Sequence, residues 1–383
     1  MNHEKNQAAW IALWRVSGVG CVHYKTLLDA FQTPENVFNA NAEQLKKAGI
    51  SLKLIKNINA QTLSSADPDM QWLQASDQHH LVTFEDPRYP QRLKEIPASP
   101  PLLYVHGDAD LLNDPQLAIV GSRNPTQGGQ NNTYEFSKHL AATGLCITSG
   151  LALGVDGIAH KGALEADGVT IAVIATGIDR VYPARHRDLA HRIVAKGAII
   201  TELPIGVSPL ARNFPRRNRI ISGISLGTLV VEAALKSGSL ISARYASEQG
   251  REVFAIPGSI HNPLARGCHQ LIRQGAKLIE TAEHILEELA PQLEQCLLTT
   301  TKADSSNAHA HAKNNSHTSS SPLADADQRL VLETMGYDPI PIDQLVIQTG
   351  LTAEALSSIL LLLELNGFIA ASGRGNYTRI KEA

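Results

Sequence analysis

The stretch QLAIVGSRNPTQGGQNNTYEFSKHLAATGLCITSG (residues 116–150) begins and ends with short apolar runs, and each run stops at serine or glycine. The residues between the two runs are numerous enough for one helix. The same alternation continues downstream through TIAVIATG, GAIITEL, GTLVVEA and EVFAIPG. Apolar strands that alternate with helices are typical of a parallel sheet covered on both faces. We therefore predict a doubly wound α/β domain with a mostly parallel sheet over about residues 111–289.

Composition divides the chain into four segments. Residues 1–75 have short helical patterns, some with glycines before a helix as in helix-hairpin-helix modules, which predict an all-helical domain. Residues 76–290 hold the α/β domain together with the residues that precede its first strand. Residues 291–322 are assigned to a flexible linker, because Ser, Thr, Asn, Ala and His leave little to bury. Residues 323–383 have three helical patterns and a hairpin around SGRGN, which predicts a winged helix.

Three features of these flanking segments have more than one interpretation. Gly18 and Gly20 precede a helix, where glycines let backbone N–H groups approach phosphate, but a tight turn is the preferred interpretation. The histidines of the linker, His309, His311 and His317, are interpreted as part of a solvated tract rather than as metal ligands. The winged-helix segment has few basic residues in its later helices, so DNA binding and protein docking remain alternatives for it.

The totals describe a chain of 383 residues with a formal net charge of −3 and 43% hydrophobic residues. Any attraction for nucleic acid must therefore come from a local concentration of charge. The four cysteines lie far apart without metal-ligand spacing, which predicts free thiols in a reducing compartment. The sequence shows no signal peptide and no apolar run of about 20 residues. We therefore predict a cytoplasmic protein that has no metal site and does not enter a membrane.

The first apolar run leads into the loop Gly121-Ser122-Arg123. This loop matches neither the dinucleotide fingerprint GxGxxG nor the P-loop GxxxxGK[ST], which disfavours NAD, FAD and P-loop nucleotides. A glycine, a hydroxyl group and an arginine do suit an oxyanion, because backbone N–H groups can approach it while the guanidinium supplies several donors. The sequence therefore predicts an anion-binding loop that uses no cofactor.

The second apolar run leads into TSGLALGVDGIAHKGALEA, in which glycines precede a helix that begins near Asp156. Asp156 and His160 are four residues apart, so a metal pair or a triad with Ser149 is conceivable. Neither is favoured, because two ligands do not make a metal site and the nucleophile elbow GxSxG is missing. We predict instead that Asp156 caps the N-terminus of the helix and that His160 is a hydrogen-bonded packing residue.

A basic run lies between Asp179 and Arg219, where nine Lys and Arg residues against three Asp and Glu residues give a local net charge of +6. Cations that follow a strand backbone, with aromatic faces under the bases, are typical of binding to single-stranded nucleic acid. Tyr182 and Phe214 supply the aromatic rings. The alternative is a solvated charged face with Phe214 in the core. The run ends in NFPRRNRIISGIS (residues 213–225), and the arginines close to Phe214 are Arg212, Arg216, Arg217 and Arg219.

Together these motifs resemble the DNA-processing protein A family, also called Smf. The loop GSR is followed, in the order seen in that family, by SGLALGVDGIAHKGAL, NFPRRNRIISGIS, VVEAALKSGSLISARYASEQGREVFAIPGSI and GCHQLIRQGAKLI. The resemblance spans about residues 86–289, in which residues 86–108 resemble the lead-in to the Rossmann-like domain of the family. Both flanks also resemble the family, which often has an N-terminal sterile-alpha-motif-like helical domain and a C-terminal winged helix. It implies a recombination mediator, not an enzyme, that binds and protects incoming single-stranded DNA. It further implies a homodimer that loads the RecA recombinase during natural transformation.

The resemblance also implies roles for individual residues. Gly121, Ser122 and Arg123 would grip phosphate. Phe214 would stack on a base, and Asn218 would hydrogen-bond to a base or to a phosphate. The segment after GCHQ resembles the dimerisation region of the family. Further positive charge would come from Arg212, Arg216, Arg217 and Arg219, and the dimer contacts from Leu271, Ile272 and Leu278.

Two other functions compete with this interpretation. SLGTLVVEA resembles part of the PGGxGTxxE loop of related Rossmann-like nucleotide phosphoribohydrolases, through Gly227, Thr228 and Glu232. The chain lacks PGG at this place and its glutamate falls one residue late, which disfavours hydrolysis. The second alternative is a regulatory docking protein whose partner binds the winged helix.

Overall fold

The computed structural model describes residues 2–300, 326–335, 339–371 and 376–380. These residues form two compact units, which are described separately. The larger unit contains residues 2–124 and 133–289, and the smaller unit contains residues 125–132 and the described residues from 290 onward.

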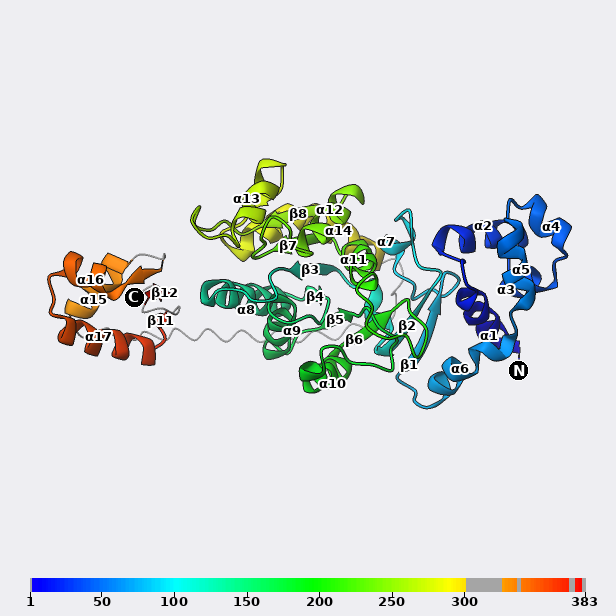
Figure 1. Cartoon of the computed structure of the whole chain (residues 1–383), viewed down its shortest axis with the longest axis horizontal. Coiled ribbons are helices and arrows are strands. Elements are labelled where there is room, and N and C mark those ends of the chain that lie inside the picture. Colours follow the sequence, from blue (N-terminus) through cyan, green and yellow to red (C-terminus); the bar gives the residue numbers. More distant parts are fainter. Residues whose placement is uncertain (1, 301–325, 336–338, 372–375, 381–383) are drawn as a thin grey trace. The chain divides into compact units, whose positions relative to one another are not determined.

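Short helices make up the N-terminal part of the larger unit, as the sequence predicts (Figure 1). Side-chain caps fix where three of them begin, because Thr33, Asn41 and Ser51 each accept a backbone N–H of the following turn. Gly18 has a φ of 93° between the first two helices, which is the tight turn expected there. The helices are α1 (Asn2–Arg15), α2 (Cys21–Phe31), α3 (Pro34–Asn39), α4 (Ala42–Lys47), α5 (Leu52–Ala60), the short 3-10 helix η1 (Leu63–Ala66) and α6 (Asp67–Gln74).

A nine-stranded sheet follows, in the order β1-β2-β6-β5-β4-β3-β7-β8-β9. The strands from β6 to β9 in this order are parallel, whereas β1 and β2 add antiparallel strands at one edge. The apolar runs in the sequence form β3 to β8, which confirms the doubly wound, mostly parallel sheet; β1, β2 and β9 were not assigned from the sequence. The strands are β1 (His79–Thr83), β2 (Leu102–Gly107), β3 (Gln116–Val120), β4 (Cys146–Ser149), β5 (Thr170–Val173), β6 (Ala198–Thr201), β7 (Gly227–Val230), β8 (Glu252–Ala255) and β9 (Lys277–Leu278).

Helices cover both faces of this sheet (Figure 1). Successive residues of a strand point to opposite faces, and β5 shows how this divides the core. Ala172 belongs to one buried cluster with Leu189 of α10, whereas Ile171 and Val173 belong to another with Ile220 of α11. The helices are α7 (Gln91–Lys94), η2 (Asp110–Asn113), α8 (Gln127–Ala142), α9 (Val155–Glu165), η3 (Ala184–His186), α10 (Arg187–Lys196), α11 (Asn213–Ile224), α12 (Ser239–Glu248) and α13 (Arg266–Arg273).

The strand order places a topological switch point at β3. From β3 the chain continues through β4, β5 and β6 on one side, and later forms β7, β8 and β9 on the other side. In doubly wound sheets, ligands bind beyond the carboxyl ends of the strands at this point. A functional site is therefore expected among the loops that follow these central strands.

The helix α14 (Ala282–Thr300) contains the boundary between the two units, at Leu289. The helix also includes residues 291–300, which composition assigns to the linker. The helix extends this far because PQLEQCLL (residues 291–298) still has apolar residues at helical spacing. The rest of the predicted linker, including His309, His311 and His317, lies outside the described residues.

The smaller unit contains a winged helix, as the sequence predicts. Its three-stranded sheet has the order β10-β12-β11. Leu345, Leu356 and Leu363 lie in its buried core, and Thr352 caps the last helix by accepting the N–H of Ala355 at 3.3 Å. The elements are α15 (Ala326–Met335), β10 (Ile340–Pro341), α16 (Ile342–Thr349), α17 (Ala353–Leu365), β11 (Ile369–Ala371) and β12 (Asn376–Arg379).

The cysteines and the helix lengths can be compared with two expectations from composition, namely free thiols and no membrane-spanning helix. All four cysteines are free thiols, and Cys146 and Cys268 are buried. In the part of the chain that the structure describes, no single helix is long and apolar enough to cross a membrane. The helices α16 and α17 reach that length and apolarity only as a pair, which is bent by 111°.

Candidate nucleic-acid interface

A cavity of about 520 Å³ lies beyond the carboxyl ends of the central strands. This volume is typical of ligand sites, which occupy about 300–1,000 Å³. The walls come from the loops after β3 to β7, from α11 as far as Ile221 and from the start of α12. Segments far apart in sequence meet here because parallel strands end at the same edge of a sheet. The charged and aromatic side chains of the described lining are Arg123, Asp156, Tyr182, Phe214 and Arg217.

Arg123 and Phe214 form the most distinctive contact of the lining. The guanidinium carbon of Arg123 lies 5.8 Å from the centroid of the Phe214 ring, which is a cation–π distance. Tyr182 meets Phe214 edge-on, with ring centroids 5.8 Å apart at 64°. Phe214 is half-buried, and Tyr182 is 50% exposed. Phe214 therefore keeps part of its surface accessible, which the stacking interpretation requires.

Arg217 supplies a buried positive charge to the same cavity. It is 6% exposed, and its Nη1 donates to the carbonyl oxygen of Val173. Gly150 leaves room for the guanidinium, because a Cβ there would collide with Nη1. Burial lowers the pKa of Arg217 to about 10, although Asp156 opposes this change, so the group is charged at neutral pH. Its buried Nε has no hydrogen-bond partner among the described residues, and such a donor is suited to an anionic ligand.

Asp156 holds the loop after β4 in place. Its carboxylate accepts the backbone N–H groups of Gly150 at 3.1 Å and Ala152 at 3.3 Å. Burial raises the pKa of Asp156, and Arg217 opposes this shift. The N-cap of α9 is Gly154 rather than Asp156. The prediction that Asp156 caps the helix is therefore wrong, because its carboxylate reaches back to the loop instead.

His160 is a buried packing residue, as predicted. Its Nδ1 lies 2.7 Å from the hydroxyl of Thr170, and that hydroxyl donates to the carbonyl oxygen of Ile147. The Nδ1 atom therefore carries the proton. The hydroxyl of Ser149 donates to the carbonyl oxygen of Ile119 at 2.6 Å. His160 and Ser149 each have a structural partner, which does not fit a catalytic triad.

The GSR loop is held by contacts of its own. Gly121 packs so closely on α9 that a Cβ would lie 2.6 Å from Cγ2 of Val155. The hydroxyl of Ser122 accepts the backbone N–H of Asn124 at 3.1 Å, as serine does in turns. Gly121 and Arg123 belong to the cavity lining and Ser122 does not. Ser122 is thus placed to shape the loop rather than to face the cavity.

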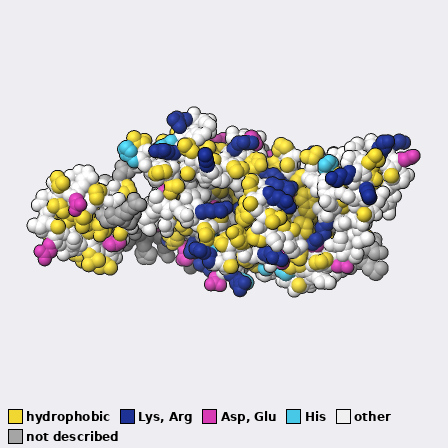
Figure 2. Space-filling view, in the orientation of Figure 1, with side chains coloured by type: hydrophobic (Ala, Val, Ile, Leu, Met, Phe, Trp, Pro, Cys, Tyr) yellow, Lys and Arg dark blue, Asp and Glu magenta, His cyan; other side chains and the backbone are white. Residues whose placement is uncertain are grey.

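The other arginines of the basic run have different surroundings. Arg212 and Arg216 are exposed at the start of α11, outside the cavity lining, and Figure 2 shows Lys and Arg side chains over this part of the larger unit. Arg219 is only 6% exposed, and its Nη2 lies 2.6 Å from Oε2 of Glu202. Because this carboxylate neutralises its charge, a direct phosphate contact does not fit the position of Arg219.

The start of α12 was missed by the sequence analysis. Asn218 donates from Nδ2 to the carbonyl oxygen of Gly238 at 3.3 Å, so this amide joins α11 to α12. The hydroxyl oxygens of Ser237 and Ser239 lie 2.6 Å apart. Hydroxyl groups at a helix N-terminus suit an anion, and the signal in the sequence is KSGSLIS. The cavity residues of this segment are Ser237, Gly238, Ser239, Ile241 and Ser242.

The residues that resemble a phosphoribohydrolase lie elsewhere. Gly227 and Thr228 are within β7, and Glu232 follows that strand at 7% exposure. These three residues are not part of the described lining of the cavity. The structure therefore does not place the carboxylate of Glu232 where a bound nucleotide would need it.

The predicted dimer residues lie at the edge of the large sheet. Leu271 and Ile272 on α13 are half-buried and pack against the core of the sheet. Leu278 on the edge strand β9 is 46% exposed. Leu271 also lines a groove of about 810 Å³ with Leu235. An exposed apolar residue on an edge strand is suited to pairing with another chain.

The fold and the site define a Rossmann-like α/β protein that has a cationic, aromatic-lined cavity in place of a dinucleotide fingerprint, together with a winged helix. The chain belongs to the DNA recombination-mediator protein A family, whose model matches residues 80–290. A model of the DprA winged helix domain matches residues 315–373.

Individual relatives agree with this assignment. Protein Smf of Escherichia coli is 40% identical over 351 residues, which cover 90% of this chain and 88% of that protein. The structure of DNA processing protein A from Streptococcus pneumoniae matches with a TM-score of 0.63 and 34% identity, over 73% of this chain and 97% of that one. DNA processing protein A from Helicobacter pylori, described by its single-stranded DNA binding mode, matches with a TM-score of 0.51 and 31% identity, over 56% of this chain and 97% of that one.

Proposed function

We propose that this protein binds single-stranded DNA in the cavity at the switch point and acts as a recombination mediator rather than as an enzyme. The observation that carries the proposal is the meeting of Arg123, Phe214 and Arg217 in one cavity. Guanidinium groups suit the phosphates of a strand, and an accessible aromatic ring in the same cavity suits a base. The Helicobacter pylori relative, which is described as binding single-stranded DNA, supports the same ligand class.

Each residue has a specific part in this proposal. Arg123, together with the backbone at Gly121, contacts phosphate. Arg217 adds a buried N–H donor, its Nε, from the wall of the cavity. Phe214 stacks on a base, and Asn218 hydrogen-bonds to a base or a phosphate from between α11 and α12. Two residues act outside the cavity: Arg212 and Arg216 attract the strand through their exposed charge.

The test is the fluorescence anisotropy of a labelled oligo(dT) titrated with wild type and Arg123→Ala over a series of salt concentrations. Each phosphate contact on a single strand contributes a slope of about 0.7 to the dependence of log K on log salt. We therefore expect Arg123→Ala to bind more weakly and with a shallower salt slope. Arg244→Ala is the matched control, because Arg244 is exposed on α12 and pairs with Glu248 outside the cavity lining.

Two results would contradict the proposal. One is wild-type protein that does not bind oligo(dT) at low salt. The other is a loss of affinity that is the same for Arg123→Ala and Arg244→Ala, since this would indicate a diffuse attraction rather than a site. Release of free base from a nucleoside monophosphate would favour the hydrolase alternative instead.

We also propose that the bound strand is handed to the RecA recombinase in the cytoplasm, during natural transformation. The support is membership of the recombination-mediator family. The measurement is the rate at which RecA assembles on oligo(dT) with and without this protein. An unchanged rate would refute the mediator role. If removal of residues 323–383 abolished assistance while Arg123→Ala did not, a regulatory docking function through the winged helix would be supported.

A homodimer is the proposed working form, with contacts from Leu271, Ile272 and Leu278. Leu278→Asp is the sharpest test, because Leu278 is 46% exposed on an edge strand and its replacement leaves the core unchanged. We expect light scattering to report a dimer for wild type and a monomer for the variant. A variant that keeps the dimer mass would place the interface elsewhere.

A further inference from the structure

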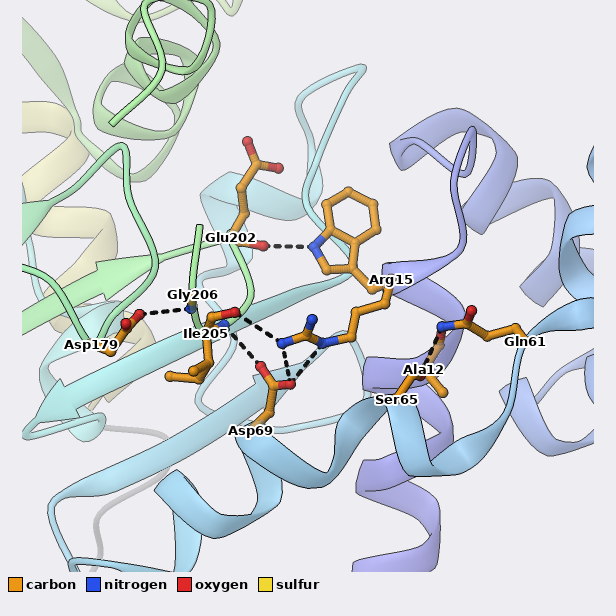
Figure 3. Close-up of polar contacts among 10 residues, drawn as sticks. Ala12, Arg15, Gln61, Ser65, Asp69, Asp179, Glu202, Ile205 and Gly206 are labelled. Carbon is orange, nitrogen blue, oxygen red and sulfur yellow. Dashed lines mark hydrogen bonds and ion pairs between the residues drawn. The ribbon is translucent and has the colours of Figure 1, made fainter. Parts of the chain in front are cut away.

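The N-terminal helices hold the loop that leads into the DNA cavity (Figure 3). Asp69 of α6 is fully buried, and its Oδ2 lies 2.6 Å from Nη2 of Arg15 at the end of α1. Its Oδ1 accepts the backbone N–H of Ile205 at 3.0 Å, and Nη2 of Arg15 donates to the carbonyl oxygen of Ile205 at 3.1 Å. One ion pair of the helical domain therefore binds both backbone groups of a single loop residue.

The next residues of this loop are fixed from the other side. Asp179, in the loop after β5, accepts the backbone N–H of Gly206 at 3.0 Å (Figure 3). Gly177 donates its backbone N–H to the carbonyl oxygen of Val207 at 2.9 Å. The loop between β6 and α11 (residues 202–212) is thus held between the helical domain and the loop that carries Tyr182.

This loop ends at the cavity. Pro209 and Ala211 line the cavity, and Phe214 follows in the first turn of α11. Its beginning is also held by the helical domain, because Nε1 of Trp14 donates to the carbonyl oxygen of Glu202 at 2.6 Å. The side chain of Glu202 in turn pairs with Arg219 of α11. Two contacts from α1 therefore hold the first half of the loop that leads to Phe214, at Glu202 and at Ile205.

We propose that the N-terminal helical domain sets the geometry of the DNA cavity through Arg15 and Asp69, which act as positioning residues for the β6–α11 loop. This inference rests on the proposed function, because its consequence is measured as affinity for single-stranded DNA. A loop that is held before binding does not have to be ordered by the ligand, and this preorganisation raises affinity. Loss of the ion pair removes one of the two sets of contacts that hold residues 203–212, so the loop becomes more mobile and affinity falls without the removal of a phosphate contact.

The experiment uses the full chain with two variants. Asp69→Ala removes the contacts of the carboxylate with Arg15 and with Ile205, whereas Asp69→Asn keeps an oxygen for the N–H of Ile205. Hydrogen exchange of residues 203–212 reports whether the loop is released, and the anisotropy titration with oligo(dT) reports affinity. Glu95→Gln is the matched control. It removes a more exposed ion pair of similar geometry, in which Nη2 of Arg251 bonds both the Glu95 carboxylate, at 2.8 Å, and the carbonyl oxygen of Arg92, at 2.9 Å.

We expect Asp69→Ala to exchange faster in residues 203–212 and to bind oligo(dT) about tenfold more weakly, within the range of coupling seen between protein sites. The salt slope stays that of wild type, because no cation of the cavity is lost. The affinity and exchange rate of Asp69→Asn lie between those of wild type and Asp69→Ala. Glu95→Gln has the affinity and exchange rate of wild type. If Asp69→Ala does not fold, the same comparison is made with Asp69→Asn and Arg15→Met.

Faster loop exchange with unchanged affinity would overturn the inference, as would a loss of affinity accompanied by a shallower salt slope. Failure of the proposed function gives a different pattern. In that case wild type does not bind, or Arg123→Ala binds as well as wild type, whatever the Asp69 variants do.

Discussion

The guanidinium of Arg123 lies over the ring of Phe214, 5.8 Å from its centroid, although the two residues come from the loop after β3 and from α11. The contact joins the two motifs that the sequence singled out, GSR and NFPRRN, in one cavity. A phosphate beside Arg123 would lie next to a base on Phe214, as in other sites for single strands. Charge and stacking can therefore be separated by experiment.

Phe214→Leu is predicted to weaken binding of oligo(dT) by about 5-fold to 150-fold. Stacking of one base on an aromatic ring contributes about 1–3 kcal/mol, and leucine stays apolar but is smaller and offers no aromatic face. The salt slope should stay that of wild type, because no charge is removed. Anisotropy titrations at several salt concentrations measure both quantities. Equal affinities for the two proteins would show that the ring packs against Arg123 without touching DNA.

Gly238→Ala is predicted to reduce DNA affinity without reducing stability. The backbone at Gly238 has φ −62° and ψ −23°, which alanine adopts readily, and a Cβ there would meet nothing within 4 Å. The same Cβ would obstruct a phosphate that approaches the N-terminus of α12. A loss of about 2- to 12-fold corresponds to one hydrogen bond of about 0.5–1.5 kcal/mol.

Gly20→Ala is the matched control for this prediction. Gly20 also precedes a helix, α2, and a Cβ there would likewise meet nothing within 4 Å. It lies in the N-terminal helical domain, outside the cavity lining. We expect its affinity for oligo(dT) to equal that of wild type, with unfolding temperatures measured for both variants. An equal loss in the two variants would indicate a general effect of the substitution and not a phosphate contact at α12.

Glu202→Gln is predicted to destabilise the larger unit by about 3–5 kcal/mol. Oε2 of Glu202 lies 2.6 Å from Nη2 of Arg219, and both side chains are at most 8% exposed. Removing one partner of such a pair leaves the other charge buried and uncompensated. Chemical unfolding measures the change, and Glu248→Gln, in an exposed pair with Arg244, should cost less than about 1 kcal/mol. If both variants lost only a similar, small amount of unfolding free energy, the buried charge of Arg219 would not need Glu202 to compensate it.

Stability is predicted to fall as the pH is lowered from about 6.5 towards 4. Burial, with smaller contributions from His186 and Arg217, lowers the pKa of His160 from 6.5 to about 3, and burial similarly lowers the pKa of His106 to about 4. Below pH 6.5 the unfolded chain therefore binds protons that the folded chain does not bind, so acid favours unfolding. Each such group contributes a slope of up to about 1.4 kcal/mol per pH unit.

The variant His160→Asn tests this pH dependence, because asparagine can still donate to the hydroxyl of Thr170 but does not titrate. We expect the free energy of unfolding to change less with pH in this variant than in wild type. His23 is exposed, and His23→Asn serves as the control. We expect the free energy of unfolding of this variant to change with pH as it does in wild type. If His160→Asn shows the full pH dependence of wild type, then His160 takes up a proton in the folded protein.

The prediction about the basic run shows how far local patterns reach. Arg216 and Arg217 are neighbours in sequence, and composition treats them alike. In the structure Arg216 is exposed, whereas Arg217 is buried beneath the cavity with room left by Gly150. Successive residues of a helix point in directions about 100° apart, and only the packing of α11 on the sheet decides which direction is inward.

The prediction about Asp156 failed for a related reason. An acidic residue near the start of a helix is a common N-cap, and the local pattern permits that role. The backbone N–H groups of Gly150 and Ala152 are closer competitors for its carboxylate, because the loop after β4 folds back over α9. Capping rules describe a helix alone and do not include a neighbouring loop.

By itself the sequence determined the alternation of strands and helices, the winged helix and the motifs that meet at the switch point, because apolar period, turn residues and charge act over a few neighbouring positions. Tertiary structure alone decided which arginines face the cavity and placed the start of α12 in the cavity wall. It also brought the carboxylate of Asp69 to the backbone N–H of Ile205, 136 residues away in the sequence. Those outcomes depend on contacts between distant segments, which form only when the sheet and its helices pack together.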